Sequence, residues 1–199
     1  VEQMIDVTFF QADRQDATIT FVSERPVATV ADVARLPGVM AAEPVRVLSA
    51  RLSFGPVSRR VTIEGRRQGA DLSRLIDVDG RPVRLPETGL VLADKLARIL
   101  GAEVGDLVKV ETLDRRRLTV DVPVTAVVQG YIGMAAYMDL EAVNRLNQEG
   151  RMITGVNVRL DRTAHNALYA EIKAMPAVAS LSLQSLALET LRRTMAENL

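Results

Sequence analysis

The sequence contains no cysteine, and this absence removes three kinds of chemistry at once. Disulfide bonds, thiol nucleophiles and cysteine-based metal sites are all excluded. The chain also lacks an excess of either charge, because 25 Lys and Arg residues balance 25 Asp and Glu residues. Nucleic-acid binders usually carry a basic excess and aromatic side chains for base stacking. With aromatic residues at only 4%, the composition argues against a nucleic-acid partner.

Long hydrophobic runs are absent as well. No stretch reaches the roughly 18 uncharged apolar residues of a membrane-spanning helix, and the longest weakly polar run covers residues 126–138. Glu2 and Asp6 stand where a signal peptide would have basic and then apolar residues. The chain begins with Val1 and its last residues follow a helical pattern, so we expect a segment from within a longer protein.

Apolar residues make up 48% of the chain, and their spacing predicts an α+β fold. Alternating apolar residues predict strands at 4–10, 17–22, 39–52, 57–64, 107–113, 117–128, 155–160 and 178–183. Helical spacing predicts helices at 30–36, 94–100, 139–146, 163–175 and 186–199, with a helical turn at 71–75. Residues 89–93 are expected to lead into the second helix. Gly101 suits a helix C-cap, and Asp139 suits an N-cap.

An internal similarity links the two ends of the chain. Residues 33–39 and 172–178 both end an amphipathic helix with Leu or Met, then Pro, a small residue and Val. A strand precedes and follows each helix, so each copy is a βαβ-like unit, although helix–proline–strand can also recur by chance. Two such units commonly form a four-stranded sheet with both helices on one face, the split βαβ arrangement.

This pairing predicts a domain organisation. Residues 1–64 and 152–185 would form one discontinuous subdomain, with residues 65–151 inserted as a second, mixed α/β subdomain. Residues 186–199 would form a final charged amphipathic helix.

Nothing in the sequence forms a catalytic, cofactor-binding or metal-binding motif. His165, the single histidine, is expected at a helix start as a surface or capping residue. Glu87 and Asp94 could be read as an acid pair, but Asp94 better suits stabilisation of a helix N-terminus. An enzyme using scattered carboxylates remains an alternative. The arginine runs at 59–60, 66–67 and 115–117 suit either solvated turns or the binding of phosphate or lipid headgroups.

Residues 130–138 form the least ordinary segment, because they combine two tyrosines, two methionines and two glycines. Methionine and tyrosine suit adaptable interfaces. Tyr131, Met134 and Tyr137, together with Phe54 in a predicted hairpin turn, are therefore candidate partner-contact residues. Packing in the core between a strand and a helix explains the segment equally well.

Residues 89–97, followed by Leu100-Gly101 and by residues 105–110, resemble the extracytoplasmic domain of FtsX-like (MacB-type) ABC transporter permeases. Residues 137–140 and the ending 194–199 share this resemblance, which covers nearly the whole chain. The resemblance implies a βαβ-rich "porter" part interrupted by a "sabre" part, which matches the predicted split.

The resemblance also implies a role. The domain would engage cargo or a partner protein outside the membrane and couple to ATP-driven motion of the membrane helices. It would itself be no enzyme and need no cofactor, because a separate cytoplasmic ATPase subunit would hydrolyse ATP. The full-length protein would be dimeric in the inner membrane, with this domain in the periplasm. The final helix would be the coupling element, with Leu186, Leu191 and Met195 on it. The alternative is a free-standing extracytoplasmic binding or adaptor module without a transport role.

Overall fold

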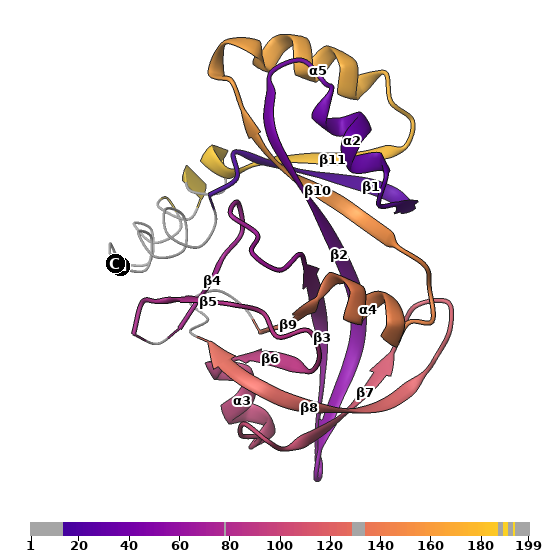
Figure 1. Ribbon diagram of the computed structural model, residues 1–199, viewed down its shortest axis with the longest axis vertical. Helices are drawn as coiled ribbons and strands as arrows, with labels where there is room; N and C mark the ends of the chain where they lie inside the picture. The colour runs from indigo at the N-terminus through magenta and orange to yellow at the C-terminus, as the bar shows by residue number, and fades with distance from the viewer. Residues whose placement is uncertain (1–13, 78, 129–133, 187–188, 191–192, 194–199) are drawn as a thin grey trace. The chain divides into compact units, whose positions relative to one another are not determined.

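The computed structural model describes residues 14–77, 79–128, 134–186, 189–190 and 193, so the strand expected at 4–10 lies outside the described residues. Helices and strands are mixed along the chain, and the fold is α+β (Figure 1). The chain divides into two compact units. Unit 1 comprises Val1–Pro44, Asp71–Arg74 and Ile153–Leu199, and unit 2 comprises Val45–Ala70 and Leu75–Met152.

Unit 1 is built from two strand–helix–strand segments. The first runs through β1 (Ala17–Pro26), α2 (Thr29–Ala34) and the beginning of β2 (Val39–Phe54). The second runs through β10 (Met152–Leu160), a short 3-10 turn, α5 (His165–Lys173) and β11 (Val178–Leu183). Their strands lie in the order β11-β1-β10-β2, which is the predicted split βαβ arrangement (Figure 1).

Simple periodicity explains the core of unit 1. Alternation along β1 buries Ala17, Ile19 and Phe21, while α5 buries Leu168 and Ile172, which are four residues apart. Helix α5 therefore buries one apolar face, as expected for a helix that covers one side of a sheet, while the short α2 buries Val33.

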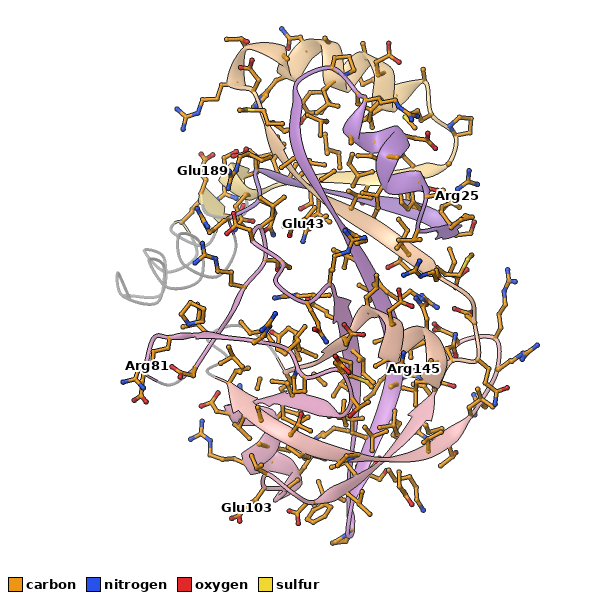
Figure 2. The ribbon with its side chains drawn as sticks, viewed as in Figure 1. Arg25, Glu43, Arg81, Glu103, Arg145 and Glu189 are labelled. Carbon is orange, nitrogen blue, oxygen red and sulfur yellow. The ribbon has the colours of Figure 1, made fainter. Side chains whose placement is uncertain are left out.

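The segment Asp71–Arg74 is not helical, so the helical turn predicted at 71–75 is wrong. Glu43, labelled in Figure 2, explains the difference, because its carboxylate accepts hydrogen bonds from the main-chain N–H groups of Asp71 (2.8 Å) and Leu72 (3.0 Å). The carbonyl of Leu72 accepts from the N–H groups of Arg14 and Gln15. With its main chain bonded in this way and the Leu72 side chain buried, the segment is held within unit 1.

Unit 2 is a closed barrel. Its strands are the second half of β2, β3 (Val57–Arg66), β9 (Ala135–Asp139), β6 (Leu90–Ala93), β8 (Thr119–Val128) and β7 (Leu107–Thr112), in that order. A further pairing between β7 and β2 joins the two ends of this series. Closure of this kind removes the unpaired sheet edges that would otherwise invite aggregation.

The barrel interior is filled by alternate residues of the strands and by the apolar faces of two helices. The helices are α3 (Asp94–Leu100) and α4 (Leu140–Leu146). Outward positions such as Ser49 and Arg51 alternate with these inward ones on β2. The buried set includes Leu48, Ala50, Leu52, Val61, Ile63, Leu90, Leu92, Leu96, Leu100, Val108, Val110 and Val143.

Two strands of the barrel were not predicted. Residues 89–93 were expected only to lead into a helix, but Leu90–Ala93 form β6, in which every residue is buried. β9 lies in the segment that was assigned either to a contact surface or to the core. Both strands have a parallel neighbour, since β6 pairs with β8 and β9 pairs with β3. Every residue of β6 is buried, so the strand shows no alternation and periodicity cannot separate it from a helix.

The helix caps follow the sequence prediction. Gly101 ends α3 in the left-handed conformation at φ 71°, where its N–H donates to the carbonyl of Ala97. The Asp139 carboxylate accepts from the N–H groups of Glu141 (3.0 Å) and Ala142 (3.2 Å) at the start of α4. Both caps depend on residues next to each other in the chain, which is why sequence alone located them.

A second, smaller apolar cluster lies elsewhere in unit 2. The hairpin of β4 (Leu75–Ile76) and β5 (Pro82–Val83) turns at Gly80, whose φ is 79°. Leu75 packs there with the following segment and with β6, β8 and β9. The buried members of this cluster are Leu75, Leu85, Val91 and Val128.

The division between the units falls within β2, at Pro44. Residues 45–64, which we expected in the same part as residues 1–44, belong to unit 2, because β2 beyond Pro44 pairs with β3 and with β7 there. A proline fits this position because its main chain has no N–H to donate to a neighbouring strand.

Arg46 carries the most deeply buried charge in unit 2. Its side chain is 0% exposed, and its Nη2 lies 2.7 Å from Oε2 of Glu149, which follows α4. Nη1 donates to the carbonyl of Val47 at 2.9 Å. The arginine therefore ties the chain beyond α4 to strand β2 within the same unit.

Glu149→Ala should destabilise unit 2 by about 3 kcal/mol, because it leaves the buried Arg46 guanidinium without this carboxylate. Arg46→Met/Glu149→Ala should be less destabilised than the single Glu149→Ala variant, since methionine removes the buried charge and keeps apolar volume. Urea denaturation of the three proteins measures the difference. A double variant at least as unstable as the single one would contradict a charge-based cost.

Gly155 of β10 should not tolerate a side chain. A Cβ placed there would lie 2.7 Å from the carbonyl oxygen of Ile19 on β1, too close for any real contact. Gly155→Ala should therefore cost about 1–3 kcal/mol of stability. Gly150→Ala is the matched control, because an added Cβ there meets nothing within 4 Å. Thermal unfolding that is equal for both variants would refute the close approach.

Candidate functional surface

The residues predicted to contact a partner lie in different environments. Phe54 ends β2 and packs, half-buried, against the barrel core. Tyr137 on β9 joins the smaller apolar cluster, and the guanidinium carbon of Arg66 lies 4.8 Å from its ring centre. Met134, just before β9, is 37% exposed. Tyr131 lies outside the described residues. Of the three described residues, Met134 is the one offered most openly to a partner.

The end of the chain begins as the predicted helix. Residues 184–186, 189–190 and 193 are helical, and Leu186 is 56% exposed. Leu191 and Met195, the other two residues assigned to the coupling helix, lie outside the described residues. Among the helices that the structure describes, none is both long enough and apolar enough to cross a membrane.

His165 begins α5 beside Asp161, and the pair shows no catalytic geometry. The Asp161 carboxylate accepts hydrogen bonds from the N–H (3.0 Å) and Oγ1 (2.9 Å) of Thr163. These two bonds are the main reason that the pKa of Asp161 is lowered, and the charge of His165 contributes less. The aspartate therefore caps the 3-10 turn before α5. Within the described ranges, no three His, Asp or Glu side chains gather in a way that could hold a metal ion.

The carboxylates considered as an acid pair are engaged separately. Asp94 binds Nη2 of Arg98 at 3.0 Å, one turn further along α3. At Glu87 it is the main-chain carbonyl that accepts a bond from Arg145, at 3.3 Å. Neither contact brings two carboxylates together for acid–base chemistry.

A shallow hollow of about 440 Å³ lies beside α3. Asp94, Arg98 and Glu103 supply its charged rim, and Glu103 is labelled in Figure 2. The exposed Val104 follows directly in the chain. The sequence predicted a helix start at Asp94 and a helix end at Gly101, but no local pattern indicated the hollow. The remaining lining residues are Ala97, Gly101, Ala102 and Val127.

The three arginine runs differ in exposure. Arg66 is almost buried in β3, where Nη2 binds the Glu64 carboxylate at 2.7 Å, so it is unavailable to a ligand. Arg59 and Arg60 are exposed on β3, and residues 115–117 are exposed between β7 and β8. Arg66 is therefore an internal residue, whereas Arg59, Arg60 and residues 115–117 lie on the surface.

Strand pairing places further basic residues next to these surface arginines. Arg51 on β2 lies directly opposite Arg60 on β3, and on its other side it faces Glu111 on β7. Nη1 of Arg51 is 3.2 Å from Glu111, and Nη1 of Arg117 approaches the same carboxylate at 4.0 Å. Lys109 pairs in register with Ser53. We call Arg51, Arg60, Lys109 and Arg117 the basic strand surface.

Sequence reasoning missed half of this surface. Arg51 and Lys109 are isolated in the sequence and drew no attention beside the arginine runs. The available signal was alternation, because both residues occupy outward positions of strands whose inward positions are apolar. Alternation shows that a residue faces outward, but it does not reveal which residue of another strand lies beside it.

No protein-family model matches the chain, and no curated protein matches its sequence. Solved structures do match it, and they define a class: extracytoplasmic domains of ABC-type transporters. The periplasmic region of MacB from Actinobacillus actinomycetemcomitans aligns with a TM-score of 0.56 at 12% identity, covering 96% of this chain and 98% of that one. The extracellular domain of the noncanonic ABC-type transporter YknZ from Gram-positive bacteria aligns with a TM-score of 0.55 at 14% identity, covering 85% and 98%. The chain therefore has the fold of a MacB-like periplasmic domain.

Replacing Arg60 should stabilise the protein rather than weaken it. Like charges directly opposite each other on paired strands are unfavourable, so Arg60→Thr should gain about 0.2–1 kcal/mol at low salt. The gain should shrink as added salt screens the charges. Arg60→Lys keeps the charge and is the control for which no gain is expected. Urea titrations at two salt concentrations test this, and a loss of stability in Arg60→Thr would contradict it.

Proposed function

We propose that this chain is the extracytoplasmic domain of an ABC transporter permease. The observation that carries the proposal is a likeness of fold over the whole length, since 96% of this chain aligns with 98% of the MacB periplasmic region. A full-length protein without membrane spans on either side of this segment would overturn the proposal and favour a free-standing binding module.

In such a protein, ATP hydrolysis and contact with cargo take place in different parts of the complex. ATP hydrolysis belongs to a separate cytoplasmic ATPase subunit, and this domain engages cargo or a partner protein on the other side of the membrane. The full-length permease is dimeric in the inner membrane, with this domain in the periplasm. Unit 1 takes the porter-like role and unit 2 the sabre-like role. Phe54, Tyr131, Met134 and Tyr137 are the partner contacts that we propose.

The helix that begins at residue 184 is the proposed mechanical link to the membrane. A helix fixes the distance and rotation between its ends, because each main-chain hydrogen bond spans one turn. A displacement applied at one end therefore reaches the other, whereas a glycine-rich linker would absorb it. We assign Leu186, Leu191 and Met195 to this link.

Inserting two glycines next to Leu191 in the full-length permease should abolish transport while ATP hydrolysis continues. The insertion interrupts the proposed link after β11, the last strand of unit 1. The matched control is the same insertion at Gly80 in the β4–β5 turn, where an added Cβ meets nothing within 4 Å. Transport and ATPase rates in reconstituted vesicles are the measurement, with thermal unfolding of the 199-residue chain as the check on folding. Normal transport after the Leu191 insertion would refute the coupling role.

A further inference from the structure

The outer face of β2, β3 and β7 concentrates positive charge in a chain that is neutral as a whole. Residues 49–62 and 107–121 together hold seven basic and three acidic side chains. Arg51 and Arg60 oppose each other across the β2–β3 ladder. Among the described residues, no carboxylate lies within ion-pair distance of Arg60 or Lys109. Glu111 pairs with Arg51, and Asp121 lies opposite Lys109 across the β7–β8 ladder, so the face carries two carboxylates and a remaining excess of positive charge.

On β2 and β3 the outward residues next to Arg51 and Arg60 are small hydroxyl residues, whereas on β7 Arg51 faces Glu111. Along β2 the outward series is Ser49, Arg51 and Ser53. Along β3 the outward series is Ser58, Arg60 and Thr62, and the two series pair residue for residue. Guanidinium and hydroxyl groups donate hydrogen bonds, and arginine matches the geometry of phosphate oxygens. This combination of side chains is therefore suited to phosphate.

A protein partner fits the same face less well. Interface hot spots are enriched in Trp, Tyr and Arg and lie in packed, desolvated pockets. The outward residues beside Arg51 and Arg60 on β2 and β3 are serine and threonine, and the exposed apolar residues Val47 and Leu107 lie further along β2 and β7. An acidic peptide would therefore find charge beside Arg51 and Arg60 but few apolar contacts.

The shape of the face favours many phosphates over one. Adjacent strands hold their side chains about 4.8 Å apart across an open sheet surface, and none of these basic residues lines the hollow beside α3. We propose that the basic strand surface binds the phosphate groups of an anionic lipid bilayer. Each basic residue near such a bilayer raises the affinity roughly fivefold. The inference stands on this strand surface and does not depend on the proposed transport function.

Sedimentation with lipid vesicles tests the proposal on the whole 199-residue chain. The chain should bind phosphatidylglycerol-containing vesicles, fail to bind pure phosphatidylcholine vesicles, and lose binding as salt is raised. Arg51→Gln/Arg60→Gln should lower the apparent affinity by between roughly fivefold and 30-fold. The control is Arg35→Gln/Arg151→Gln, which removes the same charge from two exposed arginines elsewhere, both of them ion-paired as Arg51 is. Its affinity should change less than about twofold.

Four results would overturn the proposal. The first is no binding of the unmodified chain to phosphatidylglycerol vesicles. The second is an equal loss of affinity in both double variants, which would indicate general charge attraction. Competition by millimolar inorganic phosphate would point to a site for a single free phosphate. Tighter binding to a poly-glutamate peptide than to vesicles would point to an acidic protein. Thermal unfolding of both variants shows that lost binding is not lost folding.

Discussion

The pairing of β7 with β2 is the constraint on which unit 2 depends. Without the four residue pairs that join Ala50–Ser53 to β7, the six strands would form an open sheet with two exposed edges. Closure also turns the inward residues of every strand toward one another, so that they form a single interior. Helices α3 and α4 then contribute their apolar faces to that interior. The short β2–β7 ladder thus pairs the last two strand edges and encloses the apolar core of unit 2.

The same ladder creates the basic strand surface. Because β2 is hydrogen-bonded on both sides, Arg51 has a fixed neighbour on each, Arg60 on β3 and Glu111 on β7. A shift of one residue in either register would turn these side chains toward the opposite face. The apolar residues between them, such as Leu52, prevent that shift because it would move them into water. The arrangement of surface charge is therefore held by the packing of the core beneath it.

Unit 1 shows how far local pattern alone can lead. The repeated ending of two helices at a proline, at Pro37 and Pro176, pointed to two βαβ segments, and their four strands do form one sheet. The prediction succeeded because each segment is continuous in sequence, and because crossover connections follow few topologies. It failed for Asp71–Arg74, where the carboxylate of Glu43 supplies hydrogen bonds that no local pattern reveals.

The sequence by itself determined the elements whose signals lie within a few residues of one another. These are the helices α3 and α4 with their caps Gly101 and Asp139, the alternating strands, and the absence of any cysteine chemistry. Only the tertiary structure decided which strands became neighbours. It pairs β6 in parallel with β8 and β9 in parallel with β3, closes the barrel between β7 and β2, and places Arg51 opposite Arg60. The physical reason is that caps and periodicity are local, whereas strand pairing and register depend on burying apolar residues that lie far apart in the chain.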